Sequence, residues 1–192
     1  MKTSEIIVSS SGAGMNAALD LADRTAAELG LSRRDAVRMR LLAEEMMSMV
    51  RSIVGALEGK FWIEADDHAY RLRLKTTTLL DAGQRAQLIG ASSSGKNQAH
   101  RGIMGKLRAF FEPMPIEETP AYLADAIVTT GKDGDITWSL DAYRERLKNG
   151  KDADGAQEEW DELEKSVVSH IADDIQVSIR GYDVELTIIK KL

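Results

Sequence analysis

Residues 33–55 read RRDAVRMRLLAEEMMSMVRSIVG, and they carry the strongest hydrophobic repeat in the chain. Apolar side chains recur there at helical spacing and form one continuous stripe. The stripe consists of Leu42, Met46, Met49 and Ile53, with Val50 and Val54 beside it. Ser32 precedes the segment as a helix cap, and Asp35 follows in the first turn. The pattern predicts a long amphipathic helix that packs its apolar face on another layer.

The segments on either side of this helix predict strands and one further helix. Glu5–Ser9 reads EIIVS, which is typical of a short strand, and a helical repeat runs from Met15 to Leu29. Apolar residues alternate on both sides of Asp66-Asp67-His68. This alternation predicts a β-hairpin over residues 61–74.

The rest of the chain predicts helices, an irregular region and a closing pair of strands. Helices are expected at 81–89, 102–111 and 156–172, and strands at 175–179 and 184–188. Residues 113–154 hold all three prolines and an amphipathic piece from Trp138 to Leu147, while 136–138 look too short and polar for the Walker-B strand of a P-loop protein. The order of elements predicts an α+β fold with a mixed, mainly antiparallel sheet and helices on one face.

The composition is that of a soluble protein. The 192 residues suit one domain with an insertion or a small appendage. Cysteine is absent, which excludes disulfides and thiolate metal sites, and the three histidines lack metal-ligand spacing, so no metal site is predicted. The net charge of −6 argues against broad nucleic-acid binding, and no apolar run suits a membrane span. The first residues are too polar for a signal peptide, so we expect a cytoplasmic location.

Two glycine-rich segments look like phosphate-binding loops. Gly12–Ala17 fits the GxGxxA dinucleotide pattern, but no second parallel strand is predicted after it. A strand-to-helix turn that needs small residues is therefore favoured. Gly90–Lys96 nearly matches a P-loop, although Asn97 replaces the magnesium-binding hydroxyl and a helical segment precedes the loop. P-loop-like nucleotide binding through Gly90–Lys96 is kept as an alternative.

The segment LAEEMMSM, residues 42–49, carries an acid four residues before Met49. This spacing and the order of elements resemble the histidine-kinase-like (GHKL) ATPases, and most of all their anti-sigma-factor serine kinases. The family's N-box has a Glu as general base and, four residues later, an Asn that binds Mg²⁺. The resemblance implies Glu45 as a catalytic residue and Met49 at the Asn position, where methionine offers no hard oxygen ligand.

Two further boxes of the family are matched in outline. KTTTLLDAG, residues 75–83, takes the place of DxGxG, whose Asp reads the adenine amino group, and Asp81-Ala82-Gly83 is an alternative, shifted match. HRGIMGKL, residues 100–107, resembles the glycine-rich lid. The nucleotide-contact positions that the resemblance implies are Met49, Thr76, Thr78, Asp81, Gly83, His100 and Gly102.

The resemblance covers about residues 1–112 and 172–192. It implies a two-layer α/β sandwich of the Bergerat type and a single domain over residues 1–192, with an insertion at about 113–171. Trp138, Tyr143 and Trp160 in this insertion are candidate anchors for a partner. The alternative, that they pack the insertion onto the sheet, is preferred for Trp160.

The degenerate motif positions favour a bacterial regulatory and signalling protein that binds a protein partner and needs no cofactor. The resemblance implies a sigma factor or an anti-sigma antagonist as the partner. An active serine/threonine kinase or ATPase that uses ATP and Mg²⁺, with Glu45 as base, is the first alternative. A structural or self-associating domain, such as a homodimer, is also kept open. Ser92–Ser94 are left as a lid, a linker or a phosphorylation site.

Overall fold

The computed structural model of the chain describes both ends and parts of the middle. The described residues are 1–53, 56–77, 103, 107, 111, 127–130, 136–149, 160–161, 163–164 and 166–192. Within them the chain is an α+β protein built on an antiparallel sheet. None of the helices in these ranges has the length and apolar character that crossing a membrane requires.

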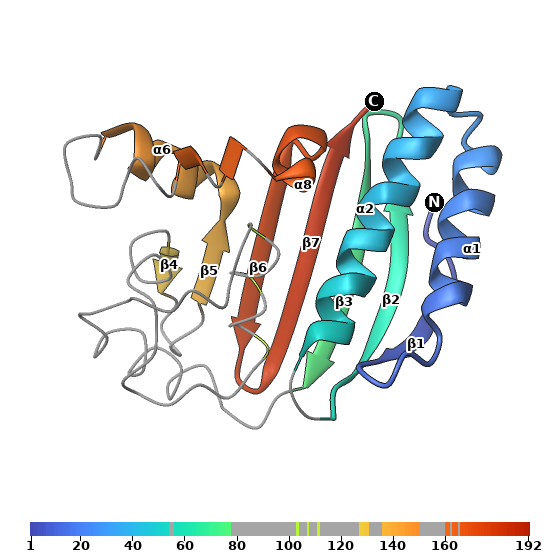
Figure 1. Ribbon diagram of the computed structural model, residues 1–192, viewed down its shortest axis with the longest axis horizontal. Helices are drawn as coiled ribbons and strands as arrows, with labels where there is room; N and C mark the ends of the chain where they lie inside the picture. Colours follow the sequence, from blue (N-terminus) through green and yellow to red (C-terminus); the bar gives the residue numbers. More distant parts are fainter. Residues whose placement is uncertain are drawn as a thin grey trace.

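At the two ends of the chain, helices and strands follow one another in the order predicted from the sequence (Figure 1). The helices are α1 (Met15–Glu28), α2 (Arg33–Ser52), α6 (Leu140–Asn149) and α8 (Val167–Ile171). The strands are β1 (Ile6–Ser9), β2 (Glu58–Ala65), β3 (Ala69–Thr77), β4 (Ile127–Thr130), β5 (Ile136–Ser139), β6 (Asp174–Arg180) and β7 (Asp183–Lys191).

The described strands form one sheet in the order β1-β2-β3-β7-β6-β5-β4. Each neighbouring pair in this order is antiparallel. The parallel component of the predicted mixed sheet is therefore not found among these strands. The two ends of the chain meet at the centre of the sheet, where β3 pairs with β7 along nine residues from Ala69↔Lys191 to Thr77↔Asp183.

The β2–β3 hairpin turns at the predicted Asp66-Asp67-His68 segment. The Asp66 carboxylate accepts hydrogen bonds from the backbone N–H groups of His68 and Ala69, at 2.9 and 3.0 Å. Arg71 donates to its other oxygen at 2.7 Å. These hydrogen bonds hold the Asp66 carboxyl in its ionised form and lower its pKa from 3.8 to about 2.

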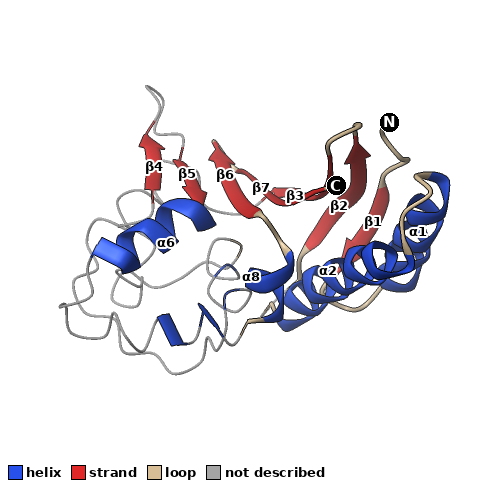
Figure 2. Ribbon diagram, turned by 90° about the horizontal axis from the view of Figure 1, so that it is seen from above, coloured by secondary structure: helices blue, strands red, loops and turns tan. Residues whose placement is uncertain are grey.

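The α1–α2 connection follows the glycine and capping signals in the sequence. Gly30 has a φ of +61°, and the N–H of Leu31 donates to the carbonyl of Ala26, which closes α1 with a left-handed turn. Ser32 then caps α2, because its hydroxyl accepts the backbone N–H of Asp35. Figure 2 shows the two helices side by side against one face of the sheet.

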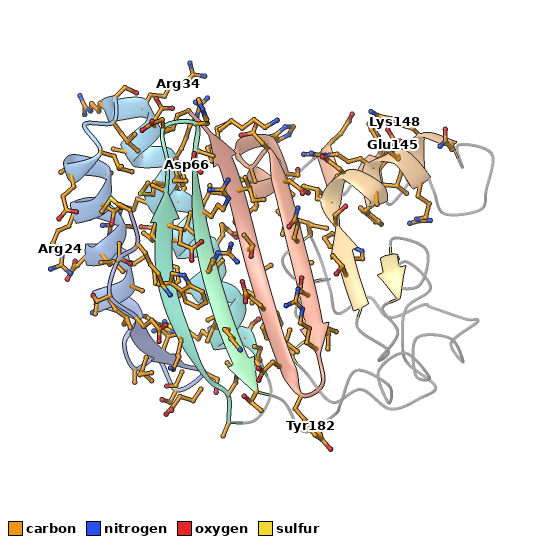
Figure 3. The ribbon with its side chains drawn as sticks, turned by 180° about the vertical axis from the view of Figure 1, so that it is seen from behind. Arg24, Arg34, Asp66, Glu145, Lys148 and Tyr182 are labelled. Atoms are coloured by element: carbon orange, nitrogen blue, oxygen red, sulfur yellow. The ribbon has the colours of Figure 1, made fainter. Side chains whose placement is uncertain are left out.

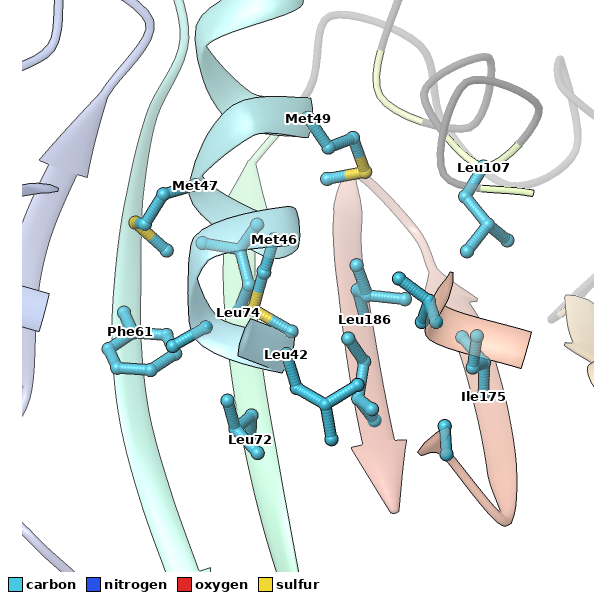
Figure 4. Packing of buried hydrophobic residues seen from close by; sticks show 14 of the residues in the cluster. Leu42, Met46, Met47, Met49, Phe61, Leu72, Leu74, Leu107, Ile175 and Leu186 are labelled. Atoms are coloured by element: carbon cyan, nitrogen blue, oxygen red, sulfur yellow. The ribbon is translucent and has the colours of Figure 1, made fainter. Parts of the chain in front are cut away.

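The core lies between α2 and the central strands. Leu42 and Met46 of α2 face Leu74 of β3 and Leu186 of β7 (Figure 4), and each of these side chains is fully buried. Along β3, from Tyr70 to Thr76, the buried residues alternate with half-buried, charged ones, so the side chains facing α2 are the buried set. The apolar stripe predicted from residues 42–53 is thus confirmed as the inner face of α2.

The middle of the chain departs most from the sequence-based expectations. Residues 136–139 form β5, a strand that the sequence analysis did not predict, and β5 pairs with β6. The amphipathic piece from Trp138 to Leu147 is divided between β5 and α6, and β4 was not predicted. Tertiary pairing explains the error: a four-residue strand beside β6 needs little propensity of its own.

The aromatic side chains of this region are packed inside. Trp138 and Tyr143 are each 1% exposed, with ring centroids 5.8 Å apart. Their assignment as partner anchors is therefore wrong, whereas Trp160 is half-buried against the core, as preferred. The predicted helix 156–172 is interrupted at Ser166, which has an extended backbone and precedes α8.

The glycines at the two ends of α1 give a matched pair of substitutions. A Cβ at Gly14 (φ +73°) would lie 1.9 Å from the carbonyl oxygen of Ile7, while a Cβ at Gly30 would meet no atom within 4 Å. We expect Gly30→Ala to cost about 1 kcal/mol through left-handed strain alone. Gly14→Ala adds a steric clash and should cost more than about 3 kcal/mol. Urea denaturation checks both values, and equal losses would contradict the packing of β1 on α1.

Asp66 predicts a pH dependence of stability. Its folded pKa is about 2 against 3.8 for the free carboxyl, so its stabilising contribution is present above pH 3.8 and is lost as pH falls towards 2. The stability gap between the wild type and Asp66→Asn should therefore close over this range in urea titrations. Asp67→Asn, which changes the exposed neighbour in the same turn, is the control and should show no such closing gap.

Candidate functional site

The predicted N-box residues lie on α2 but in different environments. Glu45 is half-buried at the flank of the helix, and it makes no hydrogen bond or ion pair within the described ranges. Met49, one turn later, is 3% exposed. Figure 4 shows its side chain extending from α2 towards Leu107, over the edge of the same core. Residue 49 therefore packs inward, as its place on the apolar stripe predicts.

The surroundings of Met49 are apolar. Its neighbours on α2, Met46 and Val50, are fully buried, and Met47 is 4% exposed. A thioether is a soft ligand, whereas Mg²⁺ takes hard oxygen ligands. Within the described part of the chain, no group of three or more histidine, aspartate or glutamate side chains is placed to hold a metal ion. Among the described residues, Met49 therefore packs with apolar side chains at the helix–sheet contact.

Thr76, which the resemblance would put at the position of the adenine-reading Asp, is 4% exposed near the end of β3. Its hydroxyl donates to the backbone carbonyl of Glu58 at 2.6 Å. The opposite residue on β2 is Gly59, where a Cβ would come within 3.0 Å of the Lys75 carbonyl oxygen. The hydroxyl of Thr76 thus stabilises the pairing of β2 with β3. At Gly59 the two strands lie close together, which leaves little room for a side chain.

Met49 and Thr76 come from the same end of the helix–sheet layer. Figure 1 shows α2 and β3 running in the same direction, so their C-terminal halves lie together. The other predicted contacts, namely Thr78, Asp81, Gly83, His100 and Gly102, lie outside the described residues, as do Ser92–Ser94 and the Gly90–Lys96 loop.

The Gly12–Ala17 turn is structural. The strand before it, β1, pairs antiparallel with β2, so the parallel neighbour of a dinucleotide fold is missing on that side. Gly14 sits at the start of α1 against the Ile7 carbonyl, which explains the need for a residue without a side chain. The favoured prediction for this segment, a strand-to-helix turn of small residues, agrees with this geometry.

The sheet face opposite α1 and α2 carries a charge network that the sequence analysis missed. Arg73 on β3 contacts Glu64 on β2 at 2.8 Å and also pairs with Glu185 on β7. Figure 3 shows the side chains of this face from behind. The signal was present in the alternation of Arg71, Arg73 and Lys75 with the buried residues of β3.

Glu64 shows the balance of forces in this network. Partial burial acts to raise its pKa, but the hydrogen bond from the Trp62 indole and the charge of Arg73 outweigh that effect. The pKa of Glu64 is therefore below its usual value. Its carboxylate forms an ion pair with Arg73 on the neighbouring strand. This environment favours the ionised carboxylate, which stabilises the strand pair and is a poor proton donor.

Comparisons with protein-family profiles, with curated proteins and with solved structures find no match for the chain.

Met49 offers a direct test of the site chemistry. Met49→Leu keeps the apolar volume and should cost less than about 1.5 kcal/mol. Met49→Asn restores the amide of the N-box but buries it among apolar side chains, and should cost at least about 2 kcal/mol. Urea denaturation measures both, with Ser48→Ala on the exposed side of α2 as control. A stable Met49→Asn variant that gains further stability from Mg²⁺ and ATP would contradict the packed arrangement.

Proposed function

We propose that this chain is a regulatory protein of the anti-sigma-factor type that acts by binding a protein partner and does not turn over ATP. The observation that carries the proposal is the burial of Met49 at the position where the GHKL resemblance puts the magnesium ligand. The partners implied by that resemblance are a sigma factor or an anti-sigma antagonist. The proposed setting is the bacterial cytoplasm.

The proposed architecture is a two-layer sandwich of the Bergerat type with its helices on one face. The burial pattern supports it, because Leu72 and Leu74 point towards α2 while Arg71 and Arg73 lie on the other side of β3. The β1-α1-α2-β2-β3 order at the start and the hairpin at the end also agree with the resemblance. A second helical layer would have to cover the charge network of the opposite face.

The chemistry of phosphoryl transfer supports a role without catalysis. Such transfer depends on positioning and on neutralising the charge of the phosphates, which Mg²⁺ does in most kinases and ATPases. The side chain of Met49 offers no oxygen atom to a metal ion. The hydroxyl of Thr76 already donates a hydrogen bond to the Glu58 carbonyl. A nucleotide at this place would have to displace packed methionine side chains and break that hydrogen bond.

The active-enzyme alternative rests on one observation, the half-buried carboxylate of Glu45 at the flank of α2. In an ATP-dependent serine/threonine kinase or ATPase, this carboxylate would act as general base. The metal would then need ligands from another part of the chain. The P-loop alternative needs a parallel strand before Gly90, which the antiparallel described strands do not provide.

Isothermal titration of the purified chain with ATP and Mg²⁺ separates these functions. We expect no binding in the micromolar range, because Met49 offers no oxygen ligand at the position that the resemblance gives to the magnesium ligand. Micromolar affinity would overturn the proposal. Hydrolysis that is lost in Glu45→Gln, with binding retained, would establish the enzyme. The proposal also predicts a positive result: the chain should co-elute with a purified sigma factor or anti-sigma antagonist in size-exclusion chromatography.

A further inference from the structure

The first turns of α2 carry an exposed cationic and apolar surface that the core does not use. Four arginines cluster there, but Arg38 pairs with Asp35 at 2.9 Å, and Arg40 pairs with Glu44 at 2.9 Å and with Asp23. Arg33 and Arg34 are exposed. Within the described ranges, neither of them makes a hydrogen bond or an ion pair.

Apolar side chains continue this surface along the helix. Val37 is 51% exposed, and Leu41 is half-buried one turn further on. Positions three and four apart lie on one side of a helix, so the four residues Arg33, Arg34, Val37 and Leu41 share a side. This side, here named the Arg33–Leu41 face, points away from the buried stripe of Leu42 and Met46.

Arg33 and Arg34 make no hydrogen bond or ion pair among the described residues, although the charge of Arg34 contributes to lowering the pKa of Asp35. The first turn of a helix carries a positive partial charge and favours acids, and Asp35 already fulfils that role. Residues that break a local rule without an evident structural gain tend to mark function. Val37, which is exposed one helical turn after Arg33, adds apolar surface on the same side.

We infer that the Arg33–Leu41 face docks an acidic, amphipathic segment of a protein partner. The guanidinium groups of Arg33 and Arg34 would pair with carboxylates, since arginine matches carboxylate geometry with two parallel hydrogen bonds. Val37 and Leu41 would contact apolar side chains spaced one helical turn apart. This inference rests on the proposed function and names the surface and the partner chemistry for it.

Charge favours this occupant over the others. Arg33 and Arg34 are only two cations, which is few for nucleic acid, because nucleic acid binds through many phosphate contacts. An anionic membrane surface attracts larger basic clusters than this one. A carboxylate-bearing peptide needs only the local positive charge and the apolar strip beside it.

The test is a fluorescence-anisotropy titration of the full chain with a labelled synthetic peptide of Glu and Leu at helical spacing. Arg33→Glu/Arg34→Glu should weaken binding by about tenfold or more. The same peptide with Lys for Glu should bind this variant better than it binds the wild type, and an unchanged circular-dichroism spectrum should show that the variant is folded. Val37→Ser should cause a smaller loss.

The matched control is Arg24→Glu/Lys148→Glu, which reverses two exposed cations away from the Arg33–Leu41 face (Figure 3). It changes the net charge equally and should leave the affinity for the Glu–Leu peptide nearly unchanged. An equal loss in this control would overturn the inference, since it would reveal attraction by overall charge. No binding of the peptide by the wild type would also overturn it.

Other occupants give distinct results. Binding of an oligonucleotide or of phosphatidylserine vesicles that Arg33→Glu/Arg34→Glu abolishes, without peptide binding, would contradict the inference. So would self-association in sedimentation runs that the same variant abolishes. A positive ATP titration would remove the proposed function but leave the peptide result standing, so the two failures are distinguishable.

Discussion

The contact between α2 and the central strands is the interaction on which the rest of the structure depends. Leu42 and Met46 bury themselves against Leu74 and Leu186, and this contact fixes the face of the sheet that the helix covers. Four of the chain's eight methionines lie on α2, and all four are buried. Methionine is flexible and fills irregular gaps, so it suits a helix that crosses strands brought together from both ends of the chain.

The same contact links the fold to the proposed function. A residue of α2 that points at the sheet can either pack or reach a ligand, and Met49 packs. The hydrogen bond from Thr76 to Glu58 closes the neighbouring end of the hairpin. With the inner side of α2 committed to the core, the side available for recognition is the solvent side, where Arg33, Arg34 and Val37 are exposed.

Local patterns predicted the two ends of the chain well, and the middle poorly. The repeat of α2, the cap at Ser32 and the alternation around Asp66 are decided within a few residues of one another, so the sequence alone reveals them. β5 owes its conformation to pairing with β6, which lies far along the chain, and β4 in turn pairs with β5, so no local pattern encodes this edge of the sheet. At the candidate site, the burial of Met49 followed from the stripe. The hydroxyl partner of Thr76 did not, because Glu58 reaches it only through strand register.

The proposed function requires that the methionine side chains of α2 pack on the sheet and do not line a metal site. Methyl NMR of the methionine-labelled chain with added Mn²⁺ and ATP tests this requirement most directly. Mn²⁺ takes oxygen ligands as Mg²⁺ does, and as a paramagnetic ion it broadens nearby signals. The packing predicts that the Met46 and Met49 methyl signals stay as sharp as that of Met1, which is 52% exposed and far along the chain from α2. Selective, ATP-dependent broadening of the Met49 signal would contradict it.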